Sequence, residues 1–290
     1  MLQLKSFVII KHQASAMLSN SKLLISVLLL TLLPLTSSQR QYVTLQNYTL
    51  SFSANALAFT DDRKYLAVGG PSGVLQVLNI EGEKVSFHSE LANDASLGNL
   101  AWIEFSSEGA WLVSCTYNGN ILIFRRNEGT GEYDKMQEIT ATNEIDSCSI
   151  SADHQYLGFM DNSTGFIHKF NSDTSLFEAY LNVTLANITY IDFTSNGGYI
   201  ILIGESEIKL YTNDGMDLTE FQTFPLKGKV SFGKVYLQDE MKFLVLPDYD
   251  PSNGKHYMNL YKYDNSLGQF VSEASEIFNT FFSHAMTADG

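Results

Sequence analysis

The chain is poor in cysteine, proline and basic residues. Its 290 residues include 2 Cys and 5 Pro, and 18 Lys and Arg stand against 32 Asp and Glu, for a formal net charge of -14. So few cysteines exclude a small domain held together by several disulfides. A hydrophobic content of 44% excludes a disordered chain. The acidic balance disfavours a nucleic-acid partner, because a general nucleic-acid binder needs a basic face to neutralise phosphates.

The sequence also lacks the common enzymatic motifs. It has no G-x-S-x-G elbow, no H-E-x-x-H pair, no P-loop and no C-x-x-C. The six histidines have no metal-ligand spacing, and the acidic stretch Pro247–Gly254 departs from a calcium loop and indicates an elaborated hairpin. The motifs therefore predict no catalytic residue, no metal and no cofactor.

The N-terminus has the order of a secretory signal. The first 38 residues carry only Lys5, Lys11 and Lys22 as formal charges, and the apolar run Leu23–Leu35 is followed by Thr36-Ser37-Ser38. The run is shorter than the roughly 20 residues that span a bilayer. We predict a signal peptide over residues 1–38, with Met17 as an alternative start, and no membrane insertion after cleavage. An uncleaved anchor and a mitochondrial presequence are the alternatives.

A repeat fills the remaining residues, 39–290. In each copy an apolar anchor is followed by five turn-like residues, then an aromatic and an aliphatic residue, as in Phe59-TDDRK-Tyr65-Leu66 and Phe105-SSEGA-Trp111-Leu112. The anchors are Phe59, Phe105, Ile150, Phe193, Leu237 and Met286, spaced 46, 45, 43, 44 and 49 residues apart. Short β-branched and aromatic runs between turns are typical of strands.

Four strands every 45 residues or so is the period of a β-propeller blade. The sequence therefore predicts an all-β propeller of four-stranded antiparallel blades, with the aromatic residue after each turn packed between blades. Five complete repeats and the start of a sixth predict an incomplete ring, truncated at the C-terminus. The segment Gln41–Ser51 is expected to be an outer strand that completes the last blade.

On these repeats, residues 42–290 resemble the WD-repeat β-propeller family, in a divergent form. The third strands end in pairs such as Leu78-Asn79 and Phe124-Arg125 where that family has Trp-Asp. The resemblance implies a propeller that binds proteins through its loop faces. Six-bladed and quinoprotein-type propellers are compatible with the same repeat.

The two cysteines lie in neighbouring repeats. Cys115 ends the second strand of the second repeat, and Cys148 lies on the first strand of the third. They are expected to be either two buried thiols or, in an oxidising compartment, a disulfide.

Two further groups of residues are candidate surface sites. Asn-x-Ser/Thr sequons, which are acceptors for N-linked glycans, occur at Asn47, Asn162, Asn182 and Asn187. The turns after the anchors hold acidic residues that would share one face of a propeller: Asp61, Asp62, Glu108, Asp153, Asp239, Glu240 and Asp289. Asp and Asn also favour turns for structural reasons. The functional hypothesis is an acidic face for a basic protein partner, with glycans on the opposite face.

The leading functional prediction is a non-catalytic protein-interaction module, secreted or luminal. It could be the ectodomain of a longer, membrane-tethered protein. One alternative is a propeller enzyme of the lactonase, glycosidase or quinoprotein type, with a site in the axial funnel near Asp146, Asp192, Cys148 and Tyr190. Another alternative is a structural subunit of a surface coat or lattice.

Overall fold

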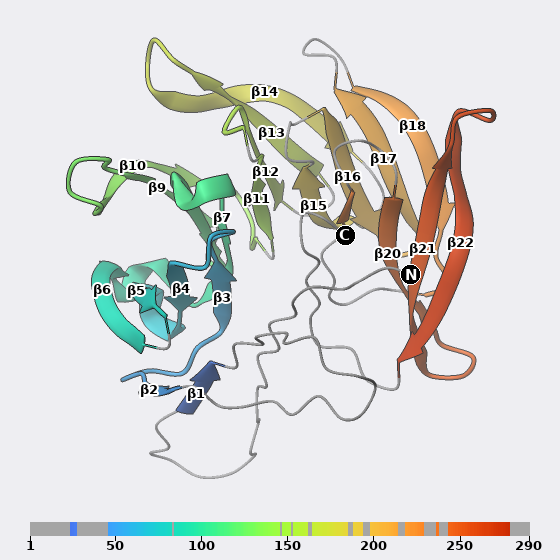
Figure 1. Ribbon diagram of the computed structural model, residues 1–290. Coiled ribbons are helices and arrows are strands. Elements are labelled where there is room, and N and C mark those ends of the chain that lie inside the picture. The colour runs from blue at the N-terminus through green and yellow to red at the C-terminus, as the bar shows by residue number, and fades with distance from the viewer. Residues whose placement is uncertain are drawn as a thin grey trace.

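Five four-stranded antiparallel sheets follow one another around a common axis (Figure 1). The computed structural model describes residues 24–27, 46–82, 84–145, 147–151, 153–161, 164–184, 188–193, 198–213, 218–228, 236–237 and 243–278. Each sheet is a meander in which consecutive strands pair, from a first strand near the axis to a fourth on the outside. The predicted β-propeller is thereby confirmed. The expected sixth anchor, Met286, lies outside the described residues.

The strands of the five blades match the repeats of the sequence. Blade 1 has β3 (Ala56–Phe59), β4 (Tyr65–Gly69), β5 (Val74–Glu81) and β6 (Lys84–Asn93). Blade 2 has β7 (Leu100–Phe105), β8 (Trp111–Thr116), β9 (Asn120–Arg126) and β10 (Tyr133–Thr140). Blade 3 has β11 (Cys148–Ile150), β12 (Tyr156–Asp161), β13 (Thr164–Asn171) and β14 (Leu176–Thr184).

Blades 4 and 5 continue the series. Blade 4 has β15 (Ile188–Phe193), β16 (Tyr199–Gly204), β17 (Glu207–Asn213) and β18 (Leu218–Pro225). Blade 5 has β19 (Tyr236–Leu237), β20 (Phe243–Asp250), β21 (Lys255–Asp264) and β22 (Gln269–Phe278). The helical elements of the described residues are three short 3-10 turns, η1 (Pro71–Gly73), η2 (Ala95–Leu97) and η3 (Ser107–Gly109). No helix in these ranges is long and apolar enough to span a membrane.

The turn after each anchor is closed by a hydroxyl side chain. The Oγ atoms of Ser106 and Ser151 accept hydrogen bonds from the backbone N–H of Trp111 and Tyr156, each at 2.9 Å. The hydroxyl of Thr60 accepts in the same way from the residue five positions on. This bond brings the first and second strands of a blade together, which explains why Ser or Thr follows the anchor in these copies.

The core lies between blades, as the repeat predicts. Trp111 from the second strand of blade 2 is buried against Phe170 and Phe177 of blade 3, with ring centroids 5.4 and 5.6 Å away. Tyr65 and Tyr156 occupy the equivalent place at the interfaces of blades 1 and 2 and of blades 3 and 4. A single sheet cannot cover its own two faces, so each blade is stabilised by its neighbours.

Each outer strand carries a bulge at the same register. The unpaired residues are His88, Met136, Tyr180, Phe221 and Glu273. Met136, Tyr180 and Phe221 pack into the interface with the next blade, whereas Glu273 is exposed. A bulge turns an extra side chain toward one face and increases the twist of the strand.

The N-terminal segment differs from its prediction. Within 41–51, β2 (Gln46–Thr49) pairs with β1 (Leu24–Val27) and not with the outer edge of another blade. β1 lies inside the predicted signal peptide, so this pairing belongs to the uncleaved chain. The residues that follow β2 have a clear physical role, because Leu50, Phe52 and Ala54 pack on the outward face of blade 1 and cover its apolar side chains.

Candidate functional site

Polar side chains recur at two positions of the innermost strands. One position before the anchor, blades 2, 3 and 4 have Glu104, Ser149 and Asp192, and three positions before it they have Trp102, Ser147 and Tyr190. We call these six residues the axial cluster. Glu104, Ser147, Ser149 and Asp192 are buried, with Asp192 only 2% exposed. Burying carboxylates is costly unless they are hydrogen-bonded, so their presence here needs an explanation.

The Asp192 carboxylate accepts hydrogen bonds from three described residues. Its Oδ1 accepts from the Ser149 hydroxyl at 2.9 Å and from the backbone N–H of Phe193 at 2.9 Å. Its Oδ2 accepts from the Tyr190 hydroxyl at 3.3 Å. The bond from Ser149 joins blade 3 to blade 4 at their innermost strands. Three donors fix the orientation of the carboxylate and stabilise its negative charge.

Blade 2 contributes the second carboxylate and an aromatic ring. Trp102 of β7 contacts Tyr190 of β15 edge to face, with ring centroids 5.3 Å apart, so blades 2 and 4 meet through this pair. Glu104, two residues further along β7, points to the same side of the strand as Trp102. The cluster therefore combines two buried carboxylates with a pair of aromatic rings.

The cluster also offers hydrogen-bond donors. Among the described residues, the indole Nε1 of Trp102 and the hydroxyl of Ser147 are buried and have no hydrogen-bond partner. Buried polar groups are normally paired, so each exception calls for an explanation such as a role in catalysis or in ligand binding. A carboxylate held in place beside free donors can take a proton from a bound water and stabilise an oxyanion.

The sequence predicted part of this cluster. Asp192 and Tyr190 belong to it, whereas Cys148 packs between blades 2 and 3 and Asp146 lies outside the described residues. Four members were not predicted: Trp102, Glu104, Ser147 and Ser149. The signal was present in the repeat register, because counting back one position from Phe105, Ile150 and Phe193 gives Glu104, Ser149 and Asp192.

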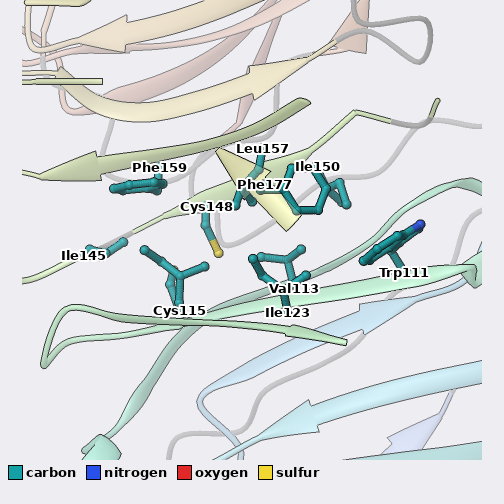
Figure 2. Close-up of a cluster of buried hydrophobic side chains, with 11 residues drawn as sticks. Trp111, Val113, Cys115, Ile123, Ile145, Cys148, Ile150, Leu157, Phe159 and Phe177 are labelled. Carbon is teal, nitrogen blue, oxygen red and sulfur yellow. The ribbon is translucent and has the colours of Figure 1, made fainter. Parts of the chain in front are cut away.

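The two cysteines lie face to face between blades 2 and 3 (Figure 2). Cys115 on β8 and Cys148 on β11 are free thiols, both fully buried, and they share a side-chain hydrogen bond. Burial, followed by this hydrogen bond, raises the pKa of Cys148 well above its usual value. A disulfide is thus absent from the structure, although the two residues are in contact.

The predicted glycosylation sites are only partly described. Asn182 is exposed, but it lies within the outer strand β14 and not in the connector expected for it. Asn47 lies in β2, where its side chain is not described, and Asn162 and Asn187 lie outside the described residues. Glycan attachment at all four stays a prediction.

The acidic turn residues are exposed where the structure describes them, at Asp61, Asp62, Glu108 and Asp153. Burial opposes the ionisation of Asp62, but hydrogen bonds from the Lys64 N–H and the Thr60 hydroxyl bring its pKa below the usual value. Asp153 likewise accepts from Ser151 at 2.6 Å. These two carboxylates therefore stabilise their own turns. Asp239, Glu240 and Asp289 lie outside the described residues, and a basic partner stays a prediction.

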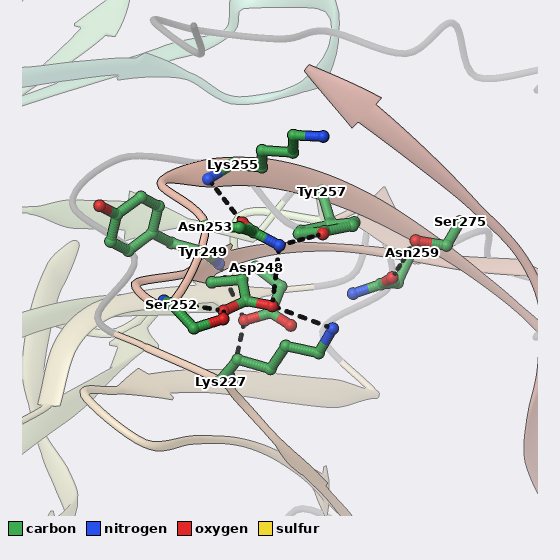
Figure 3. A network of polar contacts seen from close by, with 10 residues as sticks. Lys227, Asp248, Tyr249, Ser252, Asn253, Lys255, Tyr257, Asn259 and Ser275 are labelled. Carbon is green, nitrogen blue, oxygen red and sulfur yellow. Dashed lines mark hydrogen bonds and ion pairs between the residues drawn. The ribbon is translucent and has the colours of Figure 1, made fainter. Parts of the chain in front are cut away.

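The stretch Pro247–Gly254 is the tip of the β20–β21 hairpin, as expected (Figure 3). Asp250 accepts from the Ser252 N–H at 3.0 Å and pairs with Lys227 at 3.6 Å. The ammonium of Lys227 also lies 4.7 Å from the centre of the Tyr257 ring. The carboxylate of Asp250 therefore bonds within the hairpin tip and to Lys227. The described residues contain no group of three His, Cys, Asp or Glu that could hold a metal.

Comparisons with known proteins give structural neighbours only. No protein-family model matches the chain, and no curated relative does. The periplasmic gluconolactonase of Pseudomonas aeruginosa matches with a TM-score of 0.62 at 14% identity, over 93% of this chain and 95% of that one. A candidate 6-phosphogluconolactonase of Bacteroides uniformis matches with a TM-score of 0.60 at 12% identity, over 81% and 77%. A third, from Bacteroides fragilis, has a TM-score of 0.58 at 15% identity, over 81% and 76%. At these identities the likeness shows the fold.

These neighbours correct the leading functional prediction. A non-catalytic interaction module and a chain without enzymatic activity were expected, whereas the three neighbours above are all named as lactonases. The comparison favours the enzyme alternative over the interaction module. None of the three is named as a WD-repeat protein, so the coarser statement, a β-propeller, is the one that holds. Linear motifs could not indicate the axial cluster, because its residues come from three separate blades.

Proposed function

We propose that the chain is a β-propeller enzyme that hydrolyses a small lactone at the axial cluster. The observation that carries this proposal is the buried Asp192 carboxylate, held by Ser149 and Tyr190 at the innermost strands. The names of the structural neighbours support lactone hydrolysis as the reaction class.

In the proposed reaction Asp192 is the general base. It removes a proton from a water molecule as the water oxygen attacks the lactone carbonyl carbon. Trp102 Nε1–H and the Ser147 hydroxyl are the donors offered to the oxyanion that forms. The tetrahedral intermediate then collapses, the bond between the carbonyl carbon and the ring oxygen breaks, and protonated Asp192 returns its proton to that oxygen. The product is the open hydroxy acid, and the enzyme is regenerated.

The charge of the cluster favours an uncharged substrate. The described residues of the innermost strands include Glu104 and Asp192 but no Lys, Arg or His. A phosphorylated lactone would bring about two negative charges next to two buried acids, and the described residues of the innermost strands offer no cation to pair with them. We therefore infer a neutral sugar-acid lactone, with the rings of Trp102 and Tyr190 as apolar contacts for its carbon face.

The test is the hydrolysis of glucono-δ-lactone by wild type and by Asp192→Asn, followed by acid release above the spontaneous rate. Loss of the base should lower kcat by about 100-fold or more. The matched control is Asp161→Asn, because Asp161 is also buried but accepts from the Thr142 N–H of the connector between blades 2 and 3, and the rate of this variant should equal that of wild type. Equal rates for wild type and Asp192→Asn, or no hydrolysis of any neutral lactone, would contradict the proposal.

The chain is further proposed to enter the secretory pathway through residues 1–38. The order of basic, apolar and small polar residues in this segment supports its assignment as a secretory signal. N-terminal sequencing of the exported protein should find Gln39 first, and an intact Leu23–Leu35 segment would contradict cleavage.

A further inference from the structure

Two thiols are placed opposite each other in a part of the molecule that the proposed reaction does not use. Cys115 lies on the face of β8 that is turned to blade 3, and Cys148 lies on the face of β11 that is turned to blade 2 (Figure 2). Both are fully buried, and a hydrogen bond joins them. Their neighbours are apolar, including Val113, Ile123 and Phe159.

The packing around the pair shields the two thiols from other reaction partners. Neither thiol can meet a protein partner or a bulky reagent while blades 2 and 3 are packed, because each is 0% exposed. In the folded chain, the cysteine available to Cys115 is therefore Cys148, and the reverse. Apolar cores also hold cysteine as a simple hydrophobic residue, but here two cysteines from neighbouring blades lie in one buried cluster and interact with each other.

We propose that Cys115 and Cys148 form a disulfide that joins blade 2 to blade 3 when the chain folds in the presence of a disulfide oxidant. The thiolate of Cys115 attacks one sulfur of the oxidant RSSR and releases one RS⁻. The thiolate of Cys148 then attacks the Cys115 sulfur of the mixed disulfide and releases the second RS⁻. The two thiol protons go to the two released thiolates, so the two cysteines are oxidised and RSSR is reduced to two RSH.

The exchange takes place before the two blades pack. In the folded chain the thiols are sealed from the oxidant, and the raised pKa of Cys148 leaves it protonated at neutral pH. Thiolates are the reactive species, so exposure of the pair during folding is the step that admits the reaction. Once formed, the bond is protected from reducing agents by the same burial.

The cross-link would act on the strand that carries Glu104. Cys115 is paired across the sheet with Trp102, and the Glu104 carboxylate lies close enough to raise the pKa of Cys148. The disulfide thus ties β8 to β11 directly behind two residues of the axial cluster. A loop that runs from Cys115 through the outer half of blade 2 to Cys148 would lose conformational freedom in the unfolded chain.

The test is refolding of the full chain from denaturant in a mixture of oxidised and reduced glutathione. The refolded protein is denatured, alkylated without reduction and weighed. We expect a mass lower by two hydrogen atoms and no alkyl group. We also expect a melting temperature higher by on the order of 10 °C than that of chain refolded with reductant alone. Two alkylated cysteines, or one glutathione on each, would overturn the proposal.

Cys115→Ser and Cys148→Ser are the matched controls. Each keeps one thiol and the shape of the pair, so its melting temperature should not depend on the glutathione mixture. A redox-dependent shift as large as that of wild type in either variant would also overturn the proposal. The alkylation of wild type decides the matter even if a variant fails to fold, and neither readout depends on lactone hydrolysis.

Discussion

The interface between blades 2 and 3 and the interface between blades 1 and 2 have similar cores but different outer rims. In the first, the Gln137 amide donates to the carbonyl of Phe177 at 3.0 Å and accepts from its N–H at 2.8 Å. In the second, the residue at the same register is Ser89, whose buried hydroxyl has no hydrogen-bond partner among the described residues.

A histidine takes over part of the missing contact. His88, the bulge residue of blade 1, places its Nε2 at 3.2 Å from the Gly131 carbonyl of blade 2. The interface of blades 4 and 5 repeats the glutamine arrangement, with Gln222 bonded to both backbone groups of Phe270. An amide can copy the donor and acceptor pair of a neighbouring strand, while serine is too short to do so. The outer rim is therefore the variable part of an otherwise repeated joint.

Removing the side-chain amide of Gln137 or Gln222 should have the largest effect on stability. Gln137→Ala and Gln222→Ala should each lower the free energy of unfolding by about 1–3 kcal/mol, because each leaves a backbone N–H and C=O unpaired. Urea unfolding of both variants measures this. Gln76→Ala is the control, since Gln76 bonds only to the exposed Glu90 of its own blade. Markedly unequal losses at positions 137 and 222 would mean that the two joints are not equivalent.

Installing the amide in the deficient joint should have a smaller, opposite effect. In blade 2, Tyr133 is equivalent to Phe177 and Phe270, because each pairs with the end of its third strand at the same register. Ser89→Gln should bond to the backbone of Tyr133 and raise the free energy of unfolding by about 0.5–1.5 kcal/mol. The same urea experiment applies, and a loss of stability would show that the rim of blade 1 cannot hold the longer side chain.

The smallest expected effect is on the dependence of stability on pH. Blade 3 has His168 where blades 4 and 5 have Tyr211 and Tyr261. Burial lowers the pKa of His168 below its usual 6.5, so below that pH the unfolded chain binds more protons than the folded one and stability falls. His168→Tyr should unfold with less dependence on pH between 7 and 5. An unchanged pH dependence would place the acid sensitivity elsewhere.

The sequence was sufficient for the fold because the repeat is carried by local rules. Strand runs, turn residues and the aromatic residue after each turn are visible in five copies. Each copy therefore predicts the same strand pairing within a blade and the same aromatic packing between blades. The N-terminal strand could not be predicted in this way. Its partner, β1, shares no repeat with it, and pairing of two short strands depends on which edges are left open.

The site was harder to predict because its residues are brought together only when the blades close around the axis. Asp192 was named from its position on a first strand. Glu104 and Ser149 have no feature of their own that indicates a site. The indication is that they occupy the same position of the repeat as Asp192. The hydrogen bond that joins Ser149 to Asp192 spans two blades, and no pattern within a single repeat reports it.

The shared register of the five outer-strand bulges has a consequence for how such a chain can grow. Blades 2, 3 and 4 each supply a bulge side chain to the interface with the next blade, and blades 3 and 5 supply the strand backbone that bonds to the glutamine of the blade before. A duplication of one whole unit in the gene would therefore insert a part whose two ends already fit its new neighbours. A duplication of any other length would put the bulge out of register and leave a joint unmatched. The copy number of blades can thus change in whole steps while the packing between them is inherited intact.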